Sequence, residues 1–269
     1  MNFSVLISVY PDENAYYFCS ALNSIWFDQN AKPREIIIVK DGVLNSGLEK
    51  VINDFTSKVE CNIITIQNTI NKGLAYSLNI GIKASNYNLI ARMDSDDISL
   101  PERFQKQISF MESNPDIAVC SSLIEEYDNE MKDSIGIRYL PKHHNDIVKF
   151  AKKRSPISHP ASVFRKSIIL SVGGYPEFKK SQDYALWSLL LMNGYKMHNI
   201  QEVLLKMRTG KDFLKRRGLS YLLGEYKILK YQKKIGFISS YRYFNNLFSR
   251  SLLRLSPNSI KYYLYKNMR

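Results

Sequence analysis

The run Ala91-Arg92-Met93-Asp94-Ser95-Asp96-Asp97 follows an apolar, strand-like segment and places three acidic side chains within four residues. Carboxylates this close repel one another unless a cation or solvent compensates their charge. Alternate residues of an extended chain point the same way, so Asp94 and Asp96 can face one site. Oxygen ligands of this kind suit Mg²⁺ or Mn²⁺ held jointly with a diphosphate. The alternative is a solvated acidic turn that caps the next helix through Asp97 or Ser99.

This acidic run is one of several places where a short apolar segment gives way to polar residues. The apolar or β-branched segments span residues 5–9, 36–39, 63–66, 89–93 and 117–120. Helical patterns lie between them, which predicts an α/β fold with a mostly parallel sheet covered on both faces. Ligands of such sheets bind at the carboxyl ends of the strands, so the residues that follow each segment are candidates for chemistry.

The clearest helical pattern starts just after the acidic run. Ser99 is a suitable N-cap, Pro101 lies near the first turn, and Asn114-Pro115 should end the helix. Its predicted apolar face consists of Leu100, Phe104, Ile108 and Met111. Beyond residue 140 the pattern predicts a helix over 145–152, a loop over 155–160, a helix over 181–192 and a strand over 197–206.

Three further segments fall at strand ends or just before a helix. They are Ser8-Val9-Tyr10, Asp41-Gly42 and Asn71-Lys72-Gly73. Tyr10 could stack on a nucleotide base, and Asp41 could accept a hydrogen bond from a ring N–H. Each segment alone is also typical of an ordinary strand end or turn. Together they occupy equivalent positions in order along the chain, which favours a shared nucleotide site.

Composition and length describe a folded chain. Its 269 residues are 45% hydrophobic and 23% charged, as in globular proteins and unlike disordered ones. The three cysteines, Cys19, Cys61 and Cys120, form no paired motif, which favours a reducing compartment over a disulfide or zinc scaffold. Residues 3–9 are typical of a first core strand, and no segment approaches the ~20 apolar residues of a transmembrane helix. We therefore expect a soluble or peripheral protein.

The net charge of +13 is concentrated near the end of the chain. Residues 211–269 hold 14 of the 38 Lys and Arg residues but only 2 of the 25 Asp and Glu residues. Basic side chains alternate there with apolar ones such as Tyr226 and Leu229, and breaks are expected near Gly236 and Pro257. A basic amphipathic helix is typical of proteins that bind anionic membranes. Nucleic-acid binding, for which no recognition motif is found, and an ordinary solvated helix face are the alternatives.

These segments together resemble the inverting glycosyltransferases of family 2, which have the GT-A fold. The resemblance covers residues 3 to about 208. It is carried by Ser8-Val9-Tyr10, Val39-Lys40-Asp41-Gly42, Asn71-Lys72-Gly73, the acidic run, Leu100-Pro101-Glu102-Arg103-Phe104, Ile157-Ser158-His159-Pro160-Ala161, Gly173-Gly174-Tyr175 and Gln182-Asp183-Tyr184-Ala185-Leu186-Trp187. Lys40 and Gln182 depart from the family pattern, in which acids often stand at both positions. The stretch with Arg216-Arg217-Gly218 resembles the subgroup that builds bacterial exopolysaccharide and O-antigen repeat units.

The resemblance implies roles for particular residues. Asp96 would bind Mn²⁺ or Mg²⁺ on the diphosphate, and Asp94 would hold the ribose or the waters of the metal. Tyr10 and Asp41 would contact the uracil of a UDP-sugar. Asp183 would be the general base. The remaining contacts implied for the nucleotide sugar are Lys72, Gly73 and Arg92.

Asp183 is also a candidate base on chemical grounds. Inverting transfer needs one base to take the proton of the acceptor hydroxyl, and a metal-bound diphosphate can leave without being protonated. Without the acidic run, Asp183 would be interpreted as a helix N-terminal residue favoured by the macrodipole. His159 and Trp187 are candidates for contact with the acceptor or a phosphate. A hydrogen-bonded loop histidine and a core tryptophan are the alternatives.

The resemblance and the charge distribution together predict a GT-A domain over residues 1–208 and a basic amphipathic helical extension over residues 209–269. The expected reaction transfers galactose or glucose from a UDP-sugar to N-acetylhexosamine-diphospho-undecaprenol, forming a β-1,3 linkage. The protein would work in the cytoplasm, peripherally on the inner face of the bacterial plasma membrane, without a nucleic-acid partner. A sugar nucleotidyltransferase and a catalytically silent lipid-surface scaffold are the alternatives.

Overall fold

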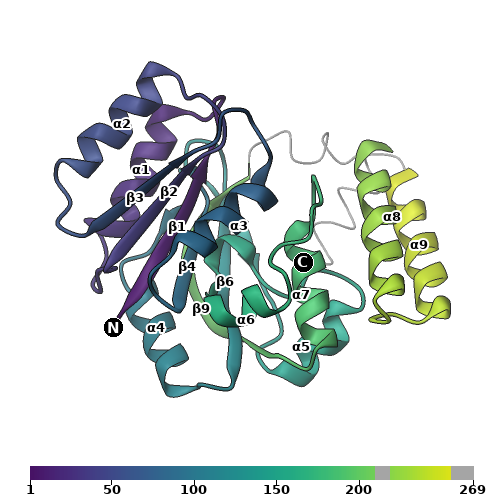
Figure 1. The fold of residues 1–269 in the computed structure, drawn as a ribbon. Coiled ribbons are helices and arrows are strands. Elements are labelled where there is room, and N and C mark those ends of the chain that lie inside the picture. Colours follow the sequence, from purple (N-terminus) through teal and green to yellow (C-terminus); the bar gives the residue numbers. More distant parts are fainter. Residues whose placement is uncertain (210–218, 256–269) are drawn as a thin grey trace.

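The computed structural model describes residues 1–209 and 219–255, which form a layered α/β fold followed by a pair of helices (Figure 1). The strands are β1 (Phe3–Val9), β2 (Glu35–Lys40), β3 (Asn62–Gln67), β4 (Leu89–Met93), β5 (Ile98–Ser99), β6 (Ile117–Tyr127), β7 (Ser134–Arg138), β8 (Val163–Arg165) and β9 (Lys196–Arg208). The helices are α1 (Ala15–Trp26), α2 (Ser46–Thr56), α3 (Leu74–Ala84), α4 (Arg103–Ser113), α5 (His144–Ala151), α6 (Lys166–Ser171), α7 (Gln182–Met192), α8 (Leu219–Lys234) and α9 (Ser240–Leu255), with a 3₁₀ turn at His159–Ala161.

The described strands form one mixed sheet in the order β3-β2-β1-β4-β8-β6-β9-β5, with β7 paired to β6. β1 pairs in parallel with β2 and β4, and β2 pairs in parallel with β3. β8 runs antiparallel to β4 and β6, whereas β6 and β9 are parallel. The parallel strands β1 to β4 end at the same edge, which brings together the residues that follow them. The predicted α/β fold with a mostly parallel sheet is confirmed.

The side chains of β1 show why helices cover both faces of the sheet. Phe3, Val5 and Ile7 pack into one core with residues of α1, α2 and α4. Leu6 packs into the other core with residues of α3, α5, α6 and α7. Successive side chains of a strand point to opposite faces, so a strand that is apolar throughout needs cover on both.

The helix that follows the acidic run begins later than its sequence pattern predicts. Ser99 lies in β5, which pairs antiparallel with β9, and its hydroxyl accepts a hydrogen bond from Gln29 Nε2 at 3.2 Å. The N-cap of α4 is Glu102, so the N-cap predicted at Ser99 was wrong. Pairing with β9 keeps the chain extended at Ser99. The C-cap at Asn114 agrees with the prediction, and three predicted apolar residues are buried in α4: Phe104, Ile108 and Met111.

Helices α8 and α9 form a hairpin beside the α/β fold (Figure 1). The turn between them contains Gly236 at a φ of +79°, which agrees with the break expected there. α8 is attached to the rest of the protein by Ile228 and Leu229, which are buried in the core that contains α7. Gln232 Nε2 also donates a hydrogen bond to Ser188 Oγ of α7 at 2.8 Å. In Figure 1, α9 lies on the side of α8 that faces away from the sheet.

Part of the predicted basic extension, residues 210–218 and 256–269, lies outside the described residues, and so does the break expected near Pro257. Neither α8, α9 nor any other helix in the described ranges combines the length and apolar character needed to span a bilayer. β9 ends at Arg208, where the sequence places the end of the first domain. The division into two domains stays a prediction, because α8 shares a core with the α/β fold.

Candidate active site

A cleft of about 410 Å³ opens where β1, β2 and β4 end and α3 begins. The residues that line it are Ser8, Tyr10, Glu13, Asp41, Asn71, Gly73, Leu74, Asp94, Ser95 and Asp96. The structure therefore brings together five of the residues that the sequence suggested as nucleotide-sugar contacts, Tyr10, Asp41, Gly73, Asp94 and Asp96. These residues come from segments far apart in the chain and meet because the parallel strands share one edge.

Asp41 shapes one wall of the cleft and is almost fully buried. Its Oδ1 accepts hydrogen bonds from the backbone N–H of Lys72 at 2.8 Å and from Asn68 Nδ2 at 2.9 Å. Its Oδ2 accepts from the backbone N–H of Gly73 at 2.9 Å. Gly73 is the N-cap of α3 and has a φ of +90°, which residues with a side chain rarely adopt. Asp41 therefore fixes the turn that starts α3, and its contact with a uracil stays a prediction.

Two lysines beside the cleft, Lys72 and Lys40, contact side chains that lie outside it. Lys72 Nζ lies 4.5 Å from the centre of the Tyr76 ring, and Lys72 is not among the residues that line the cleft. Lys40, at the position where the family often has an acid, forms an ion pair with Glu49 of α2 at 2.8 Å. This departure from the family pattern therefore leaves Asp41 as the acid at the end of β2.

The carboxylates of the acidic run experience different surroundings. Asp94 is one-third exposed and forms an ion pair with Arg92. Burial, followed by the negative charges of Asp94 and Glu13, raises the pKa of Asp96 to about 7. Asp96 therefore needs a nearby cation if it is to be fully ionised at neutral pH.

Asp97 belongs to the interior and not to the cleft. It is almost fully buried, and its Oδ1 accepts a hydrogen bond from the backbone N–H of Arg208 at 2.9 Å. Burial raises its pKa well above the usual value. Asp97 thus connects the acidic run to the end of β9. The alternative of a solvated turn in which Asp97 or Ser99 caps the next helix is contradicted, since Glu102 holds the cap position.

A divalent cation fits the cleft. The raised pKa of Asp96 reflects burial first and then the negative charges of Asp94 and Glu13, and a bound Mg²⁺ or Mn²⁺ would supply the positive charge that stabilises the ionised form. Over residues 1–209 and 219–255, no three His, Cys, Asp or Glu side chains are grouped so that they could hold a metal ion. Asp94 and Asp96 would therefore act as one or two carboxylate ligands, with phosphate oxygens and water completing the shell, as is usual for Mg²⁺.

Glu13 is a cleft residue that its sequence pattern did not reveal. It follows β1 by four residues, and its Oε2 accepts a hydrogen bond from Ser95 Oγ at 2.5 Å. It therefore ties the loop after β1 to the acidic run and adds a negative charge beside Asp96. The sequence holds little signal for this role, because a single acid in a loop is common.

Arg92 is fully buried on β4 and does not line the cleft. One of its terminal nitrogens pairs with Asp94, whereas Nε and Nη1 have no hydrogen-bond partner among the described residues. Its positive charge opposes the rise in the pKa of Asp183 and helps to lower the pKa of His159. Arg92 thus connects the acidic run electrostatically to Asp183.

Asp183 lies in the first turn of α7 and is half-buried. Its Oδ2 accepts a hydrogen bond from Ser155 Oγ at 3.4 Å, and burial raises its pKa. The N-cap residue Ser181 has a φ of +63°, a strained conformation for a residue other than glycine. Asp183 does not line the cleft described above. Burial raises the pKa of the Tyr175 hydroxyl, and the charges of Asp183 and Asp94 add to that rise, so Tyr175, like Arg92, is a neighbour of both carboxylates.

The two predicted acceptor contacts, His159 and Trp187, are buried. His159 Nε2 lies 2.9 Å from the Tyr175 hydroxyl, and burial together with the charge of Arg92 holds the pKa of His159 well below its usual value. Trp187 is fully buried, with its ring 6.0 Å from that of His159. The structure therefore favours a hydrogen-bonded loop histidine and a core tryptophan over direct contact with an acceptor or phosphate.

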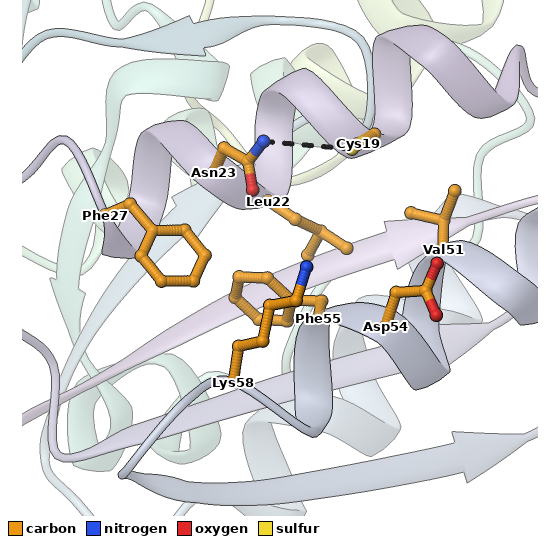
Figure 2. Close-up of a pocket in the computed structure, with 8 residues that line it drawn as sticks. All are labelled: Cys19, Leu22, Asn23, Phe27, Val51, Asp54, Phe55 and Lys58. Atoms are coloured by element: carbon orange, nitrogen blue, oxygen red, sulfur yellow. Dashed lines mark hydrogen bonds between the residues drawn. The ribbon is translucent and has the colours of Figure 1, made fainter.

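A smaller hollow of about 170 Å³ lies between α1 and α2 (Figure 2). Its lining residues are Cys19, Leu22, Asn23, Phe27, Val51, Asp54, Phe55 and Lys58. Aliphatic and aromatic groups form much of its surface, and Asn23 Nδ2 donates a weak hydrogen bond to Cys19 Sγ at 3.8 Å. None of these residues follows a strand, so the hollow is not part of the candidate active site.

The sheet order and the acidic cleft at its carboxyl edge define a glycosyltransferase fold of the GT-A class. The protein aligns with the crystal structure of S. aureus TarS with a TM-score of 0.67 and 15% identity, covering 96% of this chain and 45% of that one. It also aligns with the mannosyltransferase PcManGT from Pyrobaculum calidifontis, in complex with GDP-Man and Mn²⁺, with a TM-score of 0.65 and 14% identity, covering 93% of this chain and 68% of that one. At such identities the likeness concerns the fold alone.

The chain belongs to glycosyl transferase family 2. The model of that family matches residues 4–173, and the model of glycosyl transferase family group 2 matches residues 89–266. The second match extends past β9 into the region that contains α8 and α9. The protein is thus a glycosyltransferase, as its sequence motifs predicted.

Two relatives resemble the chain along nearly its whole length. The UDP-Gal:alpha-D-GlcNAc-diphosphoundecaprenol beta-1,3-galactosyltransferase of Escherichia coli is 36% identical, over 99% of this chain and 96% of the relative. The amylovoran biosynthesis glycosyltransferase AmsE of Erwinia amylovora is 35% identical, over 99% of both chains. The predicted likeness to the enzymes of bacterial exopolysaccharide and O-antigen assembly is confirmed.

Proposed function

We propose that this protein transfers galactose or glucose from a UDP-sugar to N-acetylhexosamine-diphospho-undecaprenol, with inversion and a β-1,3 linkage. The observation that carries the proposal is the similarity, 36% over 99% of this chain, to an E. coli enzyme named for a reaction of this kind. The second relative, which is named for amylovoran biosynthesis, supports a role in building polysaccharide repeat units.

The acidic cleft would bind the donor. Asp94 and Asp96 would hold Mn²⁺ or Mg²⁺, and the ion, when bound, neutralises charge on the leaving diphosphate. Tyr10 would stack on the uracil. The cleft also contains Gly73 at the N-terminus of α3, where backbone N–H groups and the helix dipole favour a phosphate. The turn held by Asp41 would fix that N-terminus in place.

Asp183 would act on the acceptor. The acceptor hydroxyl oxygen attacks the anomeric carbon while the bond from that carbon to the β-phosphate oxygen breaks. UDP leaves with the electron pair, and Asp183 takes the hydroxyl proton. A single displacement on an α-linked donor gives a β-linked product and needs no covalent intermediate.

The proposed acceptor also places the reaction at a membrane. Its undecaprenyl chain is hydrocarbon and stays in the bilayer, so the enzyme must reach the sugar at the lipid surface. We therefore propose that the protein works peripherally on the cytoplasmic face of the plasma membrane. The concentration of basic residues in the last fifth of the chain supports this location.

A donor screen with the full-length protein tests the proposal. Radiolabelled UDP-galactose, UDP-glucose and UDP-N-acetylglucosamine would be offered with Mn²⁺ and a synthetic GlcNAc-diphospholipid, and the product linkage read by NMR. We expect labelled lipid from a UDP-hexose and a β-1,3 product. Synthesis of a sugar nucleotide from UTP and a sugar phosphate would support a nucleotidyltransferase instead. A folded protein that performs neither reaction would support the scaffold alternative.

A further inference from the structure

Helix α9 carries an apolar stripe on its outer face. Tyr241, Phe244, Phe248 and Leu252, hereafter the α9 stripe, are 79%, 62%, 70% and 64% exposed. At about 100° per residue they fall within an arc of about 80°, so they form one continuous strip along the helix. Single exposed apolar residues are normal on a protein surface, but a run of large ones on one helix face is typical of an interaction site.

The opposite face of α9 already has its packing partners. Tyr243 is buried against α8, and Asn246 Nδ2 donates a hydrogen bond to the backbone oxygen of Lys152 at 2.7 Å. Arg250 donates a hydrogen bond to the backbone oxygen of Lys153 at 2.7 Å. These contacts fix the rotation of α9 about its axis. The α9 stripe therefore points away from the rest of the protein as a consequence of the fold.

Helix α8 adds positive charge beside the α9 stripe and exposes two apolar side chains of its own, Leu223 and Tyr226. Lys227, Lys230, Lys233 and Lys234 are exposed, whereas Ile228 and Leu229 are buried in the core. Leu229, one of the apolar residues that alternate with basic ones in the sequence, is therefore not available for contact with a membrane. The apolar residues that remain free to contact another surface are mainly those of α9.

The basic and apolar surfaces adjoin each other. Lys233 Nζ lies 5.6 Å from the ring centre of Phe244 in the α9 stripe and 5.3 Å from that of Tyr243. Residues 219–255 contain seven Lys and Arg residues and one acid, Glu225. A strip of aromatic residues bordered by lysines matches an anionic bilayer, which offers acyl chains beside negative headgroups. A second copy of the hairpin would bring the same positive charge against itself, which opposes self-association.

We propose that α9 lies in the surface of an anionic membrane, with the α9 stripe among the lipid acyl chains and the lysines of α8 beside the headgroups. This inference deepens the proposed function, on which it rests for its biological reason, because a lipid-linked acceptor requires an enzyme at that surface. It assigns the membrane contact to particular residues, and it predicts that binding needs both apolar insertion and charge.

Vesicle flotation of the full-length protein tests this proposal. The stripe variant Tyr241→Ser/Phe244→Ser/Phe248→Ser would be compared with a matched control, Tyr16→Ser/Ile135→Ser/Tyr139→Ser, which removes three exposed apolar residues elsewhere. We expect the stripe variant to bind vesicles of phosphatidylglycerol and phosphatidylcholine at least about tenfold more weakly than the wild type, since each inserted aromatic ring contributes apolar area. The control should bind like the wild type.

A second variant separates charge from insertion. Lys227→Gln/Lys230→Gln/Lys233→Gln/Lys234→Gln should lose most of the preference for phosphatidylglycerol over pure phosphatidylcholine, and wild-type binding should weaken as salt is added. Wild-type protein that ignores vesicles, or a stripe variant that binds as tightly as the wild type, would overturn the proposal. The proposal would also be overturned if the wild type sedimented as a dimer and the stripe variant as a monomer.

An assay with a short-chain, water-soluble acceptor keeps this proposal separate from the proposed function. The stripe variant should transfer sugar to that acceptor at the wild-type rate, and a large loss there would mean that the stripe maintains the fold instead. Vesicle binding without any sugar transfer would contradict the proposed function and leave the α9 contact standing. Transfer to the soluble acceptor without vesicle binding would support the proposed function and contradict the α9 contact.

Discussion

At the scale of single residues, Asp183 has surroundings that favour its protonated form, because burial raises its pKa. A carboxyl whose pKa is higher in the folded than in the unfolded protein contributes stability at low pH. That contribution is lost as the pH rises from the ordinary value of 3.8 through the folded-state pKa. At pH values above this range the raised pKa therefore lowers the stability of the fold, a cost that a catalytic role for Asp183 would explain.

Replacing Asp183 by Asn separates its effect on catalysis from its effect on stability. We expect Asp183→Asn to lower kcat by at least about a hundredfold, since an amide cannot accept the acceptor proton. Its melting temperature at neutral pH should equal or exceed that of the wild type. Sugar transfer and thermal unfolding would be measured on the same samples. Glu177→Gln, which changes an exposed acid shortly before α7, is the matched control and should keep full activity.

The pH profile of the wild type offers a second check on Asp183. Only the ionised carboxylate can act as the base, so kcat/KM should fall as the pH is lowered through the pKa of Asp183. Because burial raises this pKa, the fall should be centred above 3.8, the ordinary value of an aspartate. The residual activity of the Asp183→Asn protein provides the control. If its kcat/KM falls at low pH just as that of the wild type does, the fall belongs to another group.

Sequence patterns identified the cleft residues that follow apolar strands, because strand ends of a parallel sheet meet at one edge. Tyr10, Asp41 and Asp96 were found in this way. Glu13 was missed since its role depends on a hydrogen bond to Ser95, 82 residues away in the chain. Only folding brings two such loops together, and nothing in the local sequence around Glu13 signals the contact.

At the scale of elements, the turn into α3 depends on Asp41, which accepts backbone hydrogen bonds from Lys72 and Gly73. We expect Asp41→Ala to raise KM for the UDP-sugar by at least about tenfold, because hydrogen bonds to a charged group contribute ~1.5–3 kcal/mol and their loss frees the turn. Steady-state kinetics would measure the change. Asp28→Ala, an exposed acid after α1, should leave KM unaltered, and an unaltered KM in Asp41→Ala would contradict the role.

The packing of α3 on the sheet depends on the absence of a side chain at Gly81. A Cβ there would lie 2.3 Å from Leu6 Cδ1 and 3.1 Å from Val39 Cγ2. We expect Gly81→Ala to lower the free energy of unfolding by ~1–3 kcal/mol, as overpacked cores do. A Cβ at Gly224 of α8 would meet no atom within 4 Å among the described residues, so Gly224→Ala should instead add up to ~1 kcal/mol through helix propensity. Urea unfolding would distinguish the two, and equal stabilities would contradict this packing.

Hydrophobic periodicity in the sequence located most of the helices and strands. It did not locate those of their ends that depend on pairing with strands distant in sequence. The segment 117–120 was recognised as a strand, yet β6 continues to Tyr127 because it pairs with β9 and β7. The same kind of pairing holds Ser99 in β5 and delays α4. In both cases a partner distant in sequence overrode the local pattern, which a single sequence does not reveal.

At the scale of the whole molecule, the acidic cleft, Asp183 and the α8–α9 hairpin correspond to three needs of one reaction. The cleft would hold the nucleotide diphosphate, Asp183 would take the acceptor proton, and the hairpin would keep the protein beside a lipid. Sequence patterning anticipated the fold class and the basic charge of the chain end. Which side chains of α8 and α9 stay exposed, above all those of the α9 stripe, required the structure, because exposure depends on which helix faces are already packed.

The most direct test of this account is a crystal structure of the full-length protein with UDP and Mn²⁺, with the ion located by its anomalous scattering. We expect the ion in the cleft, coordinated by Asp96 and by oxygens of the UDP diphosphate, with Asp94 beside it and the uracil against Tyr10. An ion bound away from the Asp94 and Asp96 carboxylates, or UDP bound outside the cleft, would contradict the account.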